Sequence, residues 1–381
     1  MTAAGPQPAA HDGVRTTMTA DDAFRPRTTV RLAFADEASF THVTDPVHED
    51  LSAAARVADS LFLSCDETAG VDRLTPLGAD HWGHHTHFNL GQMFDLPDGP
   101  AGEMDIEGLA ADGGWLWVVG SHALKRGKPK REKHDAAKAL KRLRRLERDP
   151  NRFFLGRVPL AQAGDGVVRP VDVAGERRAQ SVPLFKTKSA LRRWLADEPL
   201  LDAAFALPAK ENGFDIEGLA VQGERVWLGL RGPVVNGHAI VVELDMKTDG
   251  DGDLKARKLD GKKRYRLHLL DTAGLGIREL TLDGPDLLVL LGPTMSAEGP
   301  GRILRWRDAV TDTTSGVIAP DRLEFLCALP YHAGVDHAEG LEPWPEAGER
   351  AFLVIYDGPA DHRVDHHART VDTDVVDLPP R

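Results

Sequence analysis

A six-residue motif recurs along the chain, and a fixed repeat restricts the possible folds more than any local pattern does. Asp-Ile-Glu-Gly-Leu-Ala occurs at 105–110 and again at 215–220. Each copy is followed, after a short turn, by an apolar segment of strand character, at 115–119 and at 226–230. The sequence therefore predicts a repeat protein built from one strand–turn–strand unit.

Three weaker copies extend the repeat over most of the chain. They are Gly-Ile-Arg-Glu-Leu-Thr at 276–281, His-Ala-Glu-Gly-Leu at 337–341 and His-Glu-Asp-Leu-Ser at 48–52. Successive glutamates, taken in chain order, are separated by 58, 110, 62 and 60 residues; they are Glu49, Glu107, Glu217, Glu279 and Glu339. A unit of this length with several short strands is typical of a propeller blade. The long interval holds either one blade with an insertion or two blades, so five blades are expected, with six as the alternative.

The expected fold is thus an all-β protein with a single β-propeller over residues 28–381. The last predicted strand lies at 371–378, so the last blade lacks its outer strand. That strand can come from 28–34, which alternates apolar and polar residues. This pairing would join the two ends of the chain and cover exposed edges. Residues 1–27, rich in Ala, Thr, Gly and Pro, are expected to form a disordered leader.

A basic segment interrupts the second repeat. Between Lys125 and Arg148 there are 12 Lys or Arg against 3 acidic residues, whereas the whole chain carries a net charge of −12. Helical spacing of apolar residues predicts helices at 135–147 and 189–196, within insertions of about 124–149 and 186–200. The basic helix is either a solvated surface or a docking surface for an anionic protein partner.

Several classes of protein are excluded or disfavoured by what the sequence lacks. No apolar run approaches the roughly 18 residues of a membrane-spanning helix, and no secretory signal is present, so no membrane association and a cytoplasmic location are expected. The acidic net charge argues against nucleic-acid binding. The two cysteines, Cys65 and Cys327, exclude a disulfide framework and a cysteine-ligated zinc site. Nucleophile-elbow, phosphate-loop and dinucleotide motifs are absent.

The paired motifs, the preceding segment 208–214 and the copy at 337–341 resemble a bacterial family of uncharacterised proteins, domain-of-unknown-function family 3616, from about residue 30 to 378. This resemblance implies no established activity. More loosely, a Glu-Gly step opening each blade is similar to esterase-like phytases and gluconolactonase-type propellers, in which glutamates at the tunnel mouth hold calcium or another divalent ion. The looser resemblance implies a metal site; its ligands would be Glu107, Glu217, Glu279 and Glu339. Glu49 lacks the following glycine and departs from the pattern.

Propeller geometry leads to the same expectation from the residues themselves. A glutamate opening each innermost strand places one carboxylate per blade at the same end of the central channel. Converging carboxylates raise one another's pKa or recruit a cation, and an oxygen-only site suits calcium, with magnesium as the alternative. Alternatively, each glutamate accepts hydrogen bonds from backbone N–H groups or pairs with a nearby Lys or Arg.

The second strand of each unit returns to the same face, so its end adds further groups. These ends are Asp66, His122, Arg231, Thr294 and Asp357. We expect cations to neutralise an anionic substrate and histidines to move protons; the predicted catalytic residues are His122, His337, Lys210, Arg231 and Arg278. The sequence thus predicts a divalent-metal-dependent hydrolase, phosphoesterase- or lactonase-like, acting on a small anionic ester. The alternative is a non-catalytic propeller scaffold that binds a ligand or a protein.

Overall fold

The computed structural model describes residues 26–381 except residues 42 and 131. Strands dominate, so the chain is an all-β protein, as predicted. Most of the predicted leader, residues 1–25, lies outside the described residues. Within the described part of the chain, no helix is long and apolar enough to cross a membrane.

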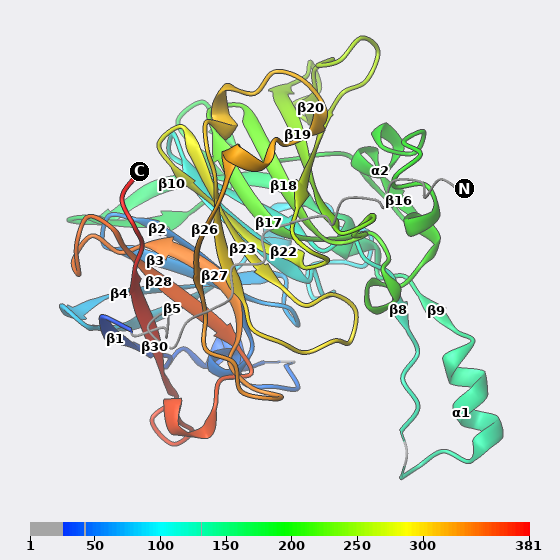
Figure 1. Cartoon of the computed structure of the whole chain (residues 1–381). Helices are drawn as coiled ribbons and strands as arrows, with labels where there is room; N and C mark the ends of the chain where they lie inside the picture. The colour runs from blue at the N-terminus through cyan, green and yellow to red at the C-terminus, as the bar shows by residue number, and fades with distance from the viewer. Residues whose placement is uncertain (1–25, 42, 131) are drawn as a thin grey trace, which may run out of the picture.

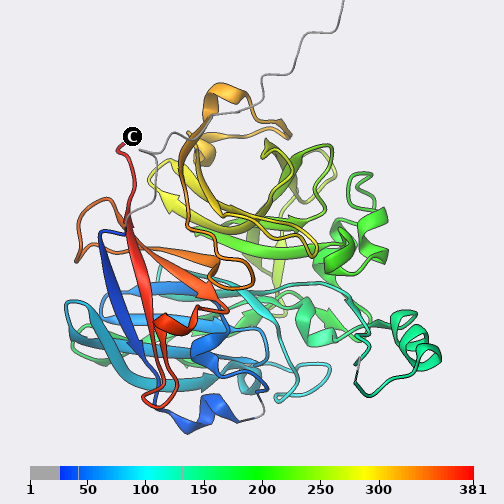
Figure 2. The ribbon, with the colours of Figure 1, turned by 60° about the horizontal axis from the view of Figure 1, so that its bottom comes forward.

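The first and last repeats form two antiparallel sets of strands. The first set is β2 (Leu51–Val57), β3 (Ser60–Cys65), β4 (Gly70–Gly78) and β5 (His81–Asn89). The last is β27 (His337–Pro343), β28 (Ala351–Asp357), β30 (Thr370–Asp377) and β1 (Thr28–Ala33). A short parallel pairing of β1 with β5 links the two sets. The N-terminal strand therefore completes the last set, and Figure 2 shows it beside the C-terminal strand.

Three further sheets lie between these sets in the sequence. The second repeat gives β6 (Ile106–Asp112), β7 (Trp115–Gly120), β10 (Leu155–Gly164) and β11 (Val167–Pro170). The third gives β17 (Asp215–Gln222), β18 (Arg225–Gly232), β19 (His238–Thr248) and β21 (Arg266–Asp271), with β20 (Leu254–Ala256) paired to β19. The fourth gives β22 (Gly276–Asp283), β23 (Asp286–Gly292), β24 (Arg302–Trp306) and β26 (Leu323–Ala328). Each run of strands is antiparallel and follows the order of the chain.

The first strand of every set faces the middle of the molecule. These strands contact one another in a closed cycle, in the order β2, β6, β17, β22, β27 and back to β2. The arrangement is therefore propeller-like, with inner strands around a common axis. Apolar side chains fill the space between neighbouring sheets; Trp227 and Trp306, both fully buried, pack in one such layer. Burial of this kind stabilises the ring and fixes the inner strands in position.

Close packing of the inner strands depends on small residues at one position. A Cβ added to Gly218 would lie 3.0 Å from the backbone nitrogen of Leu280 in the next inner strand. One added to Gly108 would lie 2.7 Å from Cβ of Leu219, also in the next inner strand. The Glu-Gly step is therefore a packing requirement as well as a source of carboxylates.

The basic insertion extends from the second repeat. The short strands β8 (Lys125–Arg126) and β9 (Leu146–Glu147) pair with each other and carry α1 (Ala136–Leu143) at their far end, away from the sheets (Figure 1). The Asp135 side chain accepts a hydrogen bond from the Lys138 N–H at 2.8 Å and so caps the helix. The helix ends four residues before the expected Glu147, because β9 pairs with β8. A second helix, α2 (Ala190–Trp194), lies within the expected 189–196.

The remaining elements are short. Two-residue strands are β12 (Val173–Ala174), β13 (Arg177–Arg178), β14 (Gln180–Ser181), β15 (Leu184–Phe185), β16 (Lys188–Ser189), β25 (Gly316–Val317) and β29 (Val364–Asp365). Single 3-10 turns include η3 (Val47–Glu49) before β2 and η7 (Ala209–Glu211) before β17.

Candidate functional site

A β-bulge near the start of every inner strand sets the geometry of the site. Where each inner strand pairs with its neighbour, the register shifts and one extra residue is inserted. A bulge re-aims the inserted side chain and often lies beside a functional site. The inserted residues are Ser52, Glu107, Glu217, Arg278 and Glu339. The fourth inner strand thus contributes an arginine where three others contribute a glutamate.

Glu279 does not join the converging glutamates, which corrects the sequence prediction. It stands one residue beyond the bulge, in the position that Gly218 occupies in β17. Its Oε1 accepts hydrogen bonds from the backbone N–H groups of Leu219, at 3.0 Å, and Leu280, at 2.6 Å. Burial raises the pKa of Glu279 well above its usual value. This carboxyl group is a backbone acceptor between two inner strands, which was the alternative expected from the sequence.

Arg278 takes the central place among the carboxylates. Its Nε lies 3.0 Å from Glu217 Oε2, and its Nη1 lies 3.3 Å from Glu217 Oε1. Its Nη2 pairs with Glu339 of the next inner strand. Arg278, Glu217 and Glu339 are all buried. The guanidinium is a cation that belongs to the protein itself, and it therefore supplies part of the positive charge that converging carboxylates require.

Arg231, at the end of β18, adds a second cation to this group. Its Nη2 lies 2.5 Å from Asp215 Oδ2, and its Nη1 lies 2.6 Å from Glu217 Oε1. Burial opposes the charged form, but Asp215 and Glu217 outweigh it and raise the pKa of Arg231. For Glu217 the balance is reversed: burial raises its pKa, against the opposing effect of Arg231 and Arg278.

Further acidic groups lie on the side of the first two repeats. Glu107 makes no ion pair or side-chain hydrogen bond with any residue that the structure describes, and burial together with Asp105 and Glu217 raises its pKa strongly. Asp105 pairs with Arg152, whose Nη1 lies 2.5 Å from Asp105 Oδ2. Burial, and then the neighbouring Asp66, raises the pKa of Asp50 to about 9.

The predicted metal ligands do not fit one calcium cage. Guanidinium groups occupy the oxygens of Glu217 and Glu339, and backbone N–H groups occupy Glu279. Among the described residues, three potential ligand atoms lie within 4.8 Å of one another in a different group, formed by His48, Glu49 and His366. Calcium requires six or more oxygens around one point. Only Glu107 of the four predicted ligands keeps its carboxylate unpaired among the described residues.

A cavity of about 310 Å³ opens beside Arg278 and brings together five of the predicted residues. They are Lys210, Arg231, Arg278, His337 and Glu339. Asp357, at the end of β28, also lines it. The sequence placed it on this face as a strand end, but assigned it no catalytic or metal-binding role.

Lys210 differs from the two arginines of the cavity because no described carboxylate pairs with it. It lies within the 3-10 turn η7, and its side chain is exposed at the cavity wall. Desolvation by the surrounding protein, and then the nearby Lys128 and Arg231, lowers the pKa of its ammonium group, while Asp357 acts in the opposite direction. An ammonium group held among other cations favours a bound anion. Lys128 belongs to the basic insertion, so the base of the insertion lies near this cavity.

The two predicted histidines lie in different environments. His337 lines the cavity, with Nδ1 3.8 Å from Asp357 Oδ2 and 39% of its side chain exposed. His122 is fully buried against Phe153 and Phe214, where its Nε2 donates to the backbone oxygen of Phe154 at 3.1 Å. Burial lowers the pKa of His122 to about 3. Its expected place at the channel mouth was therefore wrong, because the ring turns into the core after β7.

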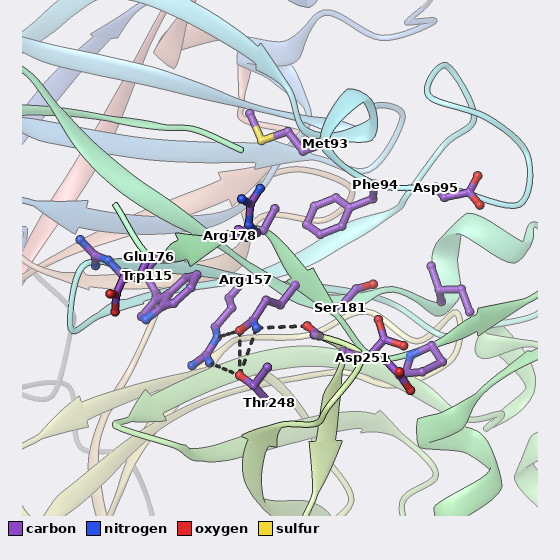
Figure 3. A pocket seen from close by; sticks show the side chains of 17 residues that line it. Met93, Phe94, Asp95, Trp115, Arg157, Glu176, Arg178, Ser181, Thr248 and Asp251 are labelled. Atoms are coloured by element: carbon purple, nitrogen blue, oxygen red, sulfur yellow. Dashed lines mark hydrogen bonds between the residues drawn. The ribbon is translucent and has the colours of Figure 1, made fainter. Parts of the chain in front are cut away.

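A hollow of about 770 Å³ on the side of the molecule is a junction between sheets (Figure 3). Arg157 stacks on Trp115, with its guanidinium carbon 4.2 Å from the ring centroid. Gln180 bonds to both Arg157 and Thr248, at 3.0 Å in each case. These polar groups satisfy one another across the second and third sheets, so the hollow offers a ligand few free partners.

Comparison with known proteins places the chain in a family. Residues 50–374 match the family described as "Protein of unknown function (DUF3616)". The chain belongs to this family. The family resemblance expected from the sequence is thereby confirmed for this DUF3616 protein, and no curated protein matches it.

Solved structures similar to this DUF3616 protein include a glutaminyl cyclase from Myxococcus xanthus. The two are 10% identical with a TM-score of 0.38, over 92% of this chain and 99% of the cyclase. The periplasmic gluconolactonase PpgL from Pseudomonas aeruginosa is 14% identical with a TM-score of 0.31, over 86% of this chain and 70% of the lactonase.

Proposed function

We propose that the 310 Å³ cavity binds a small anionic ester, a phosphoester in the simplest case, and hydrolyses it. The observation that carries this proposal is Lys210, an ammonium group on the cavity wall without a carboxylate partner among the described residues. Arg231 and Arg278 stand on the same wall, but carboxylates already hold them. Lys210 therefore binds the anionic group, and the arginines add positive potential behind it.

His337 is the proposed general base. Its ring lines the cavity, and Asp357 lies on its Nδ1 side, which leaves Nε2 to accept a proton from an attacking water. The separation of 3.8 Å between Nδ1 and Asp357 is longer than a hydrogen bond, and we expect it to shorten when substrate fills the cavity. Lys210 would then stabilise the charge that develops on the phosphoryl group.

The proposal needs no metal step. Calcium or magnesium dependence stays a prediction from the sequence, and Glu107, with its unpaired carboxylate, is the residue through which an ion would act. Elemental analysis and assays with added calcium or with a chelator test that prediction directly.

A non-catalytic ligand-binding scaffold is the second candidate function. The mutual pairing of Glu217, Arg231 and Arg278 supports it, because a network satisfied internally is a stable structural element.

We also propose that the ring of inner strands corresponds to five blades, one per repeat, with α1 as an insertion in the second. Docking of an acidic protein partner on residues 125–148 and a cytoplasmic location belong to the same proposal.

Variants at two positions distinguish binding from catalysis. Lys210→Met should weaken inorganic phosphate binding, measured by calorimetry, by about ten- to hundredfold, because one charge-assisted contact is lost. Lys262→Met, an exposed lysine between β20 and β21, is the matched control. His337→Asn should lower phosphoester or lactone hydrolysis by about a hundredfold or more while phosphate affinity stays within about threefold. Equal phosphate affinity in wild type and Lys210→Met would refute the proposed anion-binding site. Absence of hydrolysis by wild type in every assay would refute the catalytic proposal and favour the ligand-binding scaffold.

A further inference from the structure

Two histidines and a glutamate meet where the chain enters the first sheet. His48 and Glu49 lie in η3, directly before β2, and His366 lies in the turn between β29 and β30. Their potential ligand atoms lie within 4.8 Å of one another. Glu49 and His366 are 317 residues apart in the sequence, so the group joins the first set of strands to the last.

The distances within the group suit a small ion. His366 Nδ1 lies 2.8 Å from Glu49 Oε1, and His48 Nε2 lies 3.5 Å from the same oxygen. Ligand atoms around a tetrahedral zinc ion, each about 2.0–2.2 Å from it, are separated by roughly 3.3–3.6 Å. Small side-chain adjustments therefore place three donors on one ion.

The buried histidine provides an independent indication. His48 is 3% exposed and packs against Phe34 and Phe40. Neither of its ring nitrogens has a hydrogen-bond partner among the described residues, although buried polar atoms normally have one. Burial lowers the pKa of His48, which favours the neutral ring that metal ligation requires. Its Nε2, the nitrogen nearest Glu49, is an unpartnered donor atom directed at the group.

We propose that His48 Nε2, Glu49 Oε1 and His366 Nδ1 bind a divalent first-row transition ion, Zn²⁺ being the principal candidate. Two imidazoles and one carboxylate form a donor set that zinc uses in proteins, with water in the fourth position. Binding requires the tautomer of His366 that carries its proton on Nε2. The proton now at Nδ1 therefore moves to Nε2 or, from a charged ring, to solvent.

Nearby charges do not prevent binding. The guanidinium of Arg369 faces His48, but it is engaged by Glu37, whose Oε1 lies 2.6 Å from Arg369 Nη1. The ion would cross-link η3 to the β29–β30 turn. This link between the first and last sets of strands would add to the pairing of β1 with β30. None of its ligands lines the 310 Å³ cavity, so this inference does not rest on the proposed function.

Zinc titration of the chelator-treated full chain tests the site. We expect His366→Ala to bind one equivalent less than wild type, or to bind it at least tenfold more weakly, because one of three ligands is lost. His366 is 66% exposed, so its replacement should not disturb folding. His367→Ala, an exposed neighbour outside the group, is the matched control and should bind as wild type does. Glu49→Gln provides a second ligand variant. Co²⁺ should give the visible absorption of a tetrahedral site in wild type and in His367→Ala, and a weaker absorption or none in His366→Ala and Glu49→Gln.

Thermal unfolding gives a separate readout. Zn²⁺ in excess should raise the Tm of wild type and of His367→Ala by the same amount, and that of His366→Ala by clearly less or not at all. Equal zinc stoichiometry and affinity in wild type, His366→Ala and Glu49→Gln would overturn the proposal. An equal Tm shift in wild type and His366→Ala would also overturn it, whatever the catalytic assays show.

Discussion

Replacing Arg278 by methionine tests whether this arginine compensates the buried carboxylates. The substitution keeps much of the side-chain volume and removes all three guanidinium contacts with Glu217 and Glu339. Two carboxylates then remain in a buried site with fewer cations. Removing one partner of a buried ion pair costs about 3–5 kcal/mol, and the side chain of Arg278 is only 10% exposed, so little of this is screened by solvent.

The loss should depend on pH with a definite sign. Without Arg278 the folded-state pKa of Glu217 rises further above its unfolded value, because one of the two arginines that lowered it is gone. A carboxyl group with a raised folded pKa makes the folded state take up protons as the pH falls, so the penalty of the variant is relieved on acidification. The destabilisation should therefore be about 3–5 kcal/mol near pH 8 and clearly smaller near pH 5.

Equilibrium urea unfolding followed by tryptophan fluorescence measures this difference. Arg257→Met is the matched control, because Arg257 pairs with Asp245 at a site where both side chains are partly exposed, and its loss should cost less than about 1 kcal/mol. Adding Glu217→Gln to Arg278→Met should restore part of the stability by removing one uncompensated charge. A loss below about 1 kcal/mol near pH 8, or a loss that does not change with pH, would refute the view that Arg278 serves as the counterion.

Two further predictions concern the corrected residues. Glu279→Gln should cost less than about 1 kcal/mol, because an amide oxygen still accepts from Leu219 and Leu280, whereas Glu279→Ala should cost about 1–3 kcal/mol; equal losses in urea unfolding would contradict the role as backbone acceptor. His122 has its pKa lowered from 6.5 to about 3, so the unfolded state binds more protons below pH 6.5 and stability should fall by about 2 kcal/mol between pH 7 and pH 5. His122→Leu should lack this component of the decline, and an unchanged slope in the variant would show that the ring is not held neutral.

The repeat predicted the architecture well because it reports directly on packing. Four of the five copies have an apolar residue at the second and fifth positions, and three of these have glycine between them. This pattern reflects the close approach of neighbouring inner strands, as Gly218 and Leu280 illustrate. The insertion was also recognisable, since its charge differs so strongly from the rest of the chain. The closure of the last set by β1 followed from counting strands.

The composition of the site was harder to predict, because the copies were aligned on their glutamates. Had they been aligned on the apolar positions, Ile277 and Leu280 would have matched Ile216 and Leu219, and Arg278 would have fallen on Glu217. The bulge adds one residue at this place in every copy, so the identity of the inserted side chain, rather than the nearest glutamate, decides what reaches the axis.

The clustering of His48, Glu49 and His366 carried no sequence signal at all. These residues meet only because the ring brings the first and last sets of strands together, and their separation of 317 positions hides the contact. Similarly, the direction of the His122 ring depends on packing against Phe153 and Phe214, which periodicity does not reveal.

The pairing of β1 with both β30 and β5 has a consequence for biosynthesis. While the ribosome is still translating the first four repeats, residues 28–33 have no antiparallel partner, because β30 has yet to emerge. The edge of β1 that later pairs with β30 stays uncovered during that interval and can pair with other nascent chains. Ring closure is therefore a late step, and chains released before residue 370 should be far more prone to aggregation or to capture by chaperones than the full-length product.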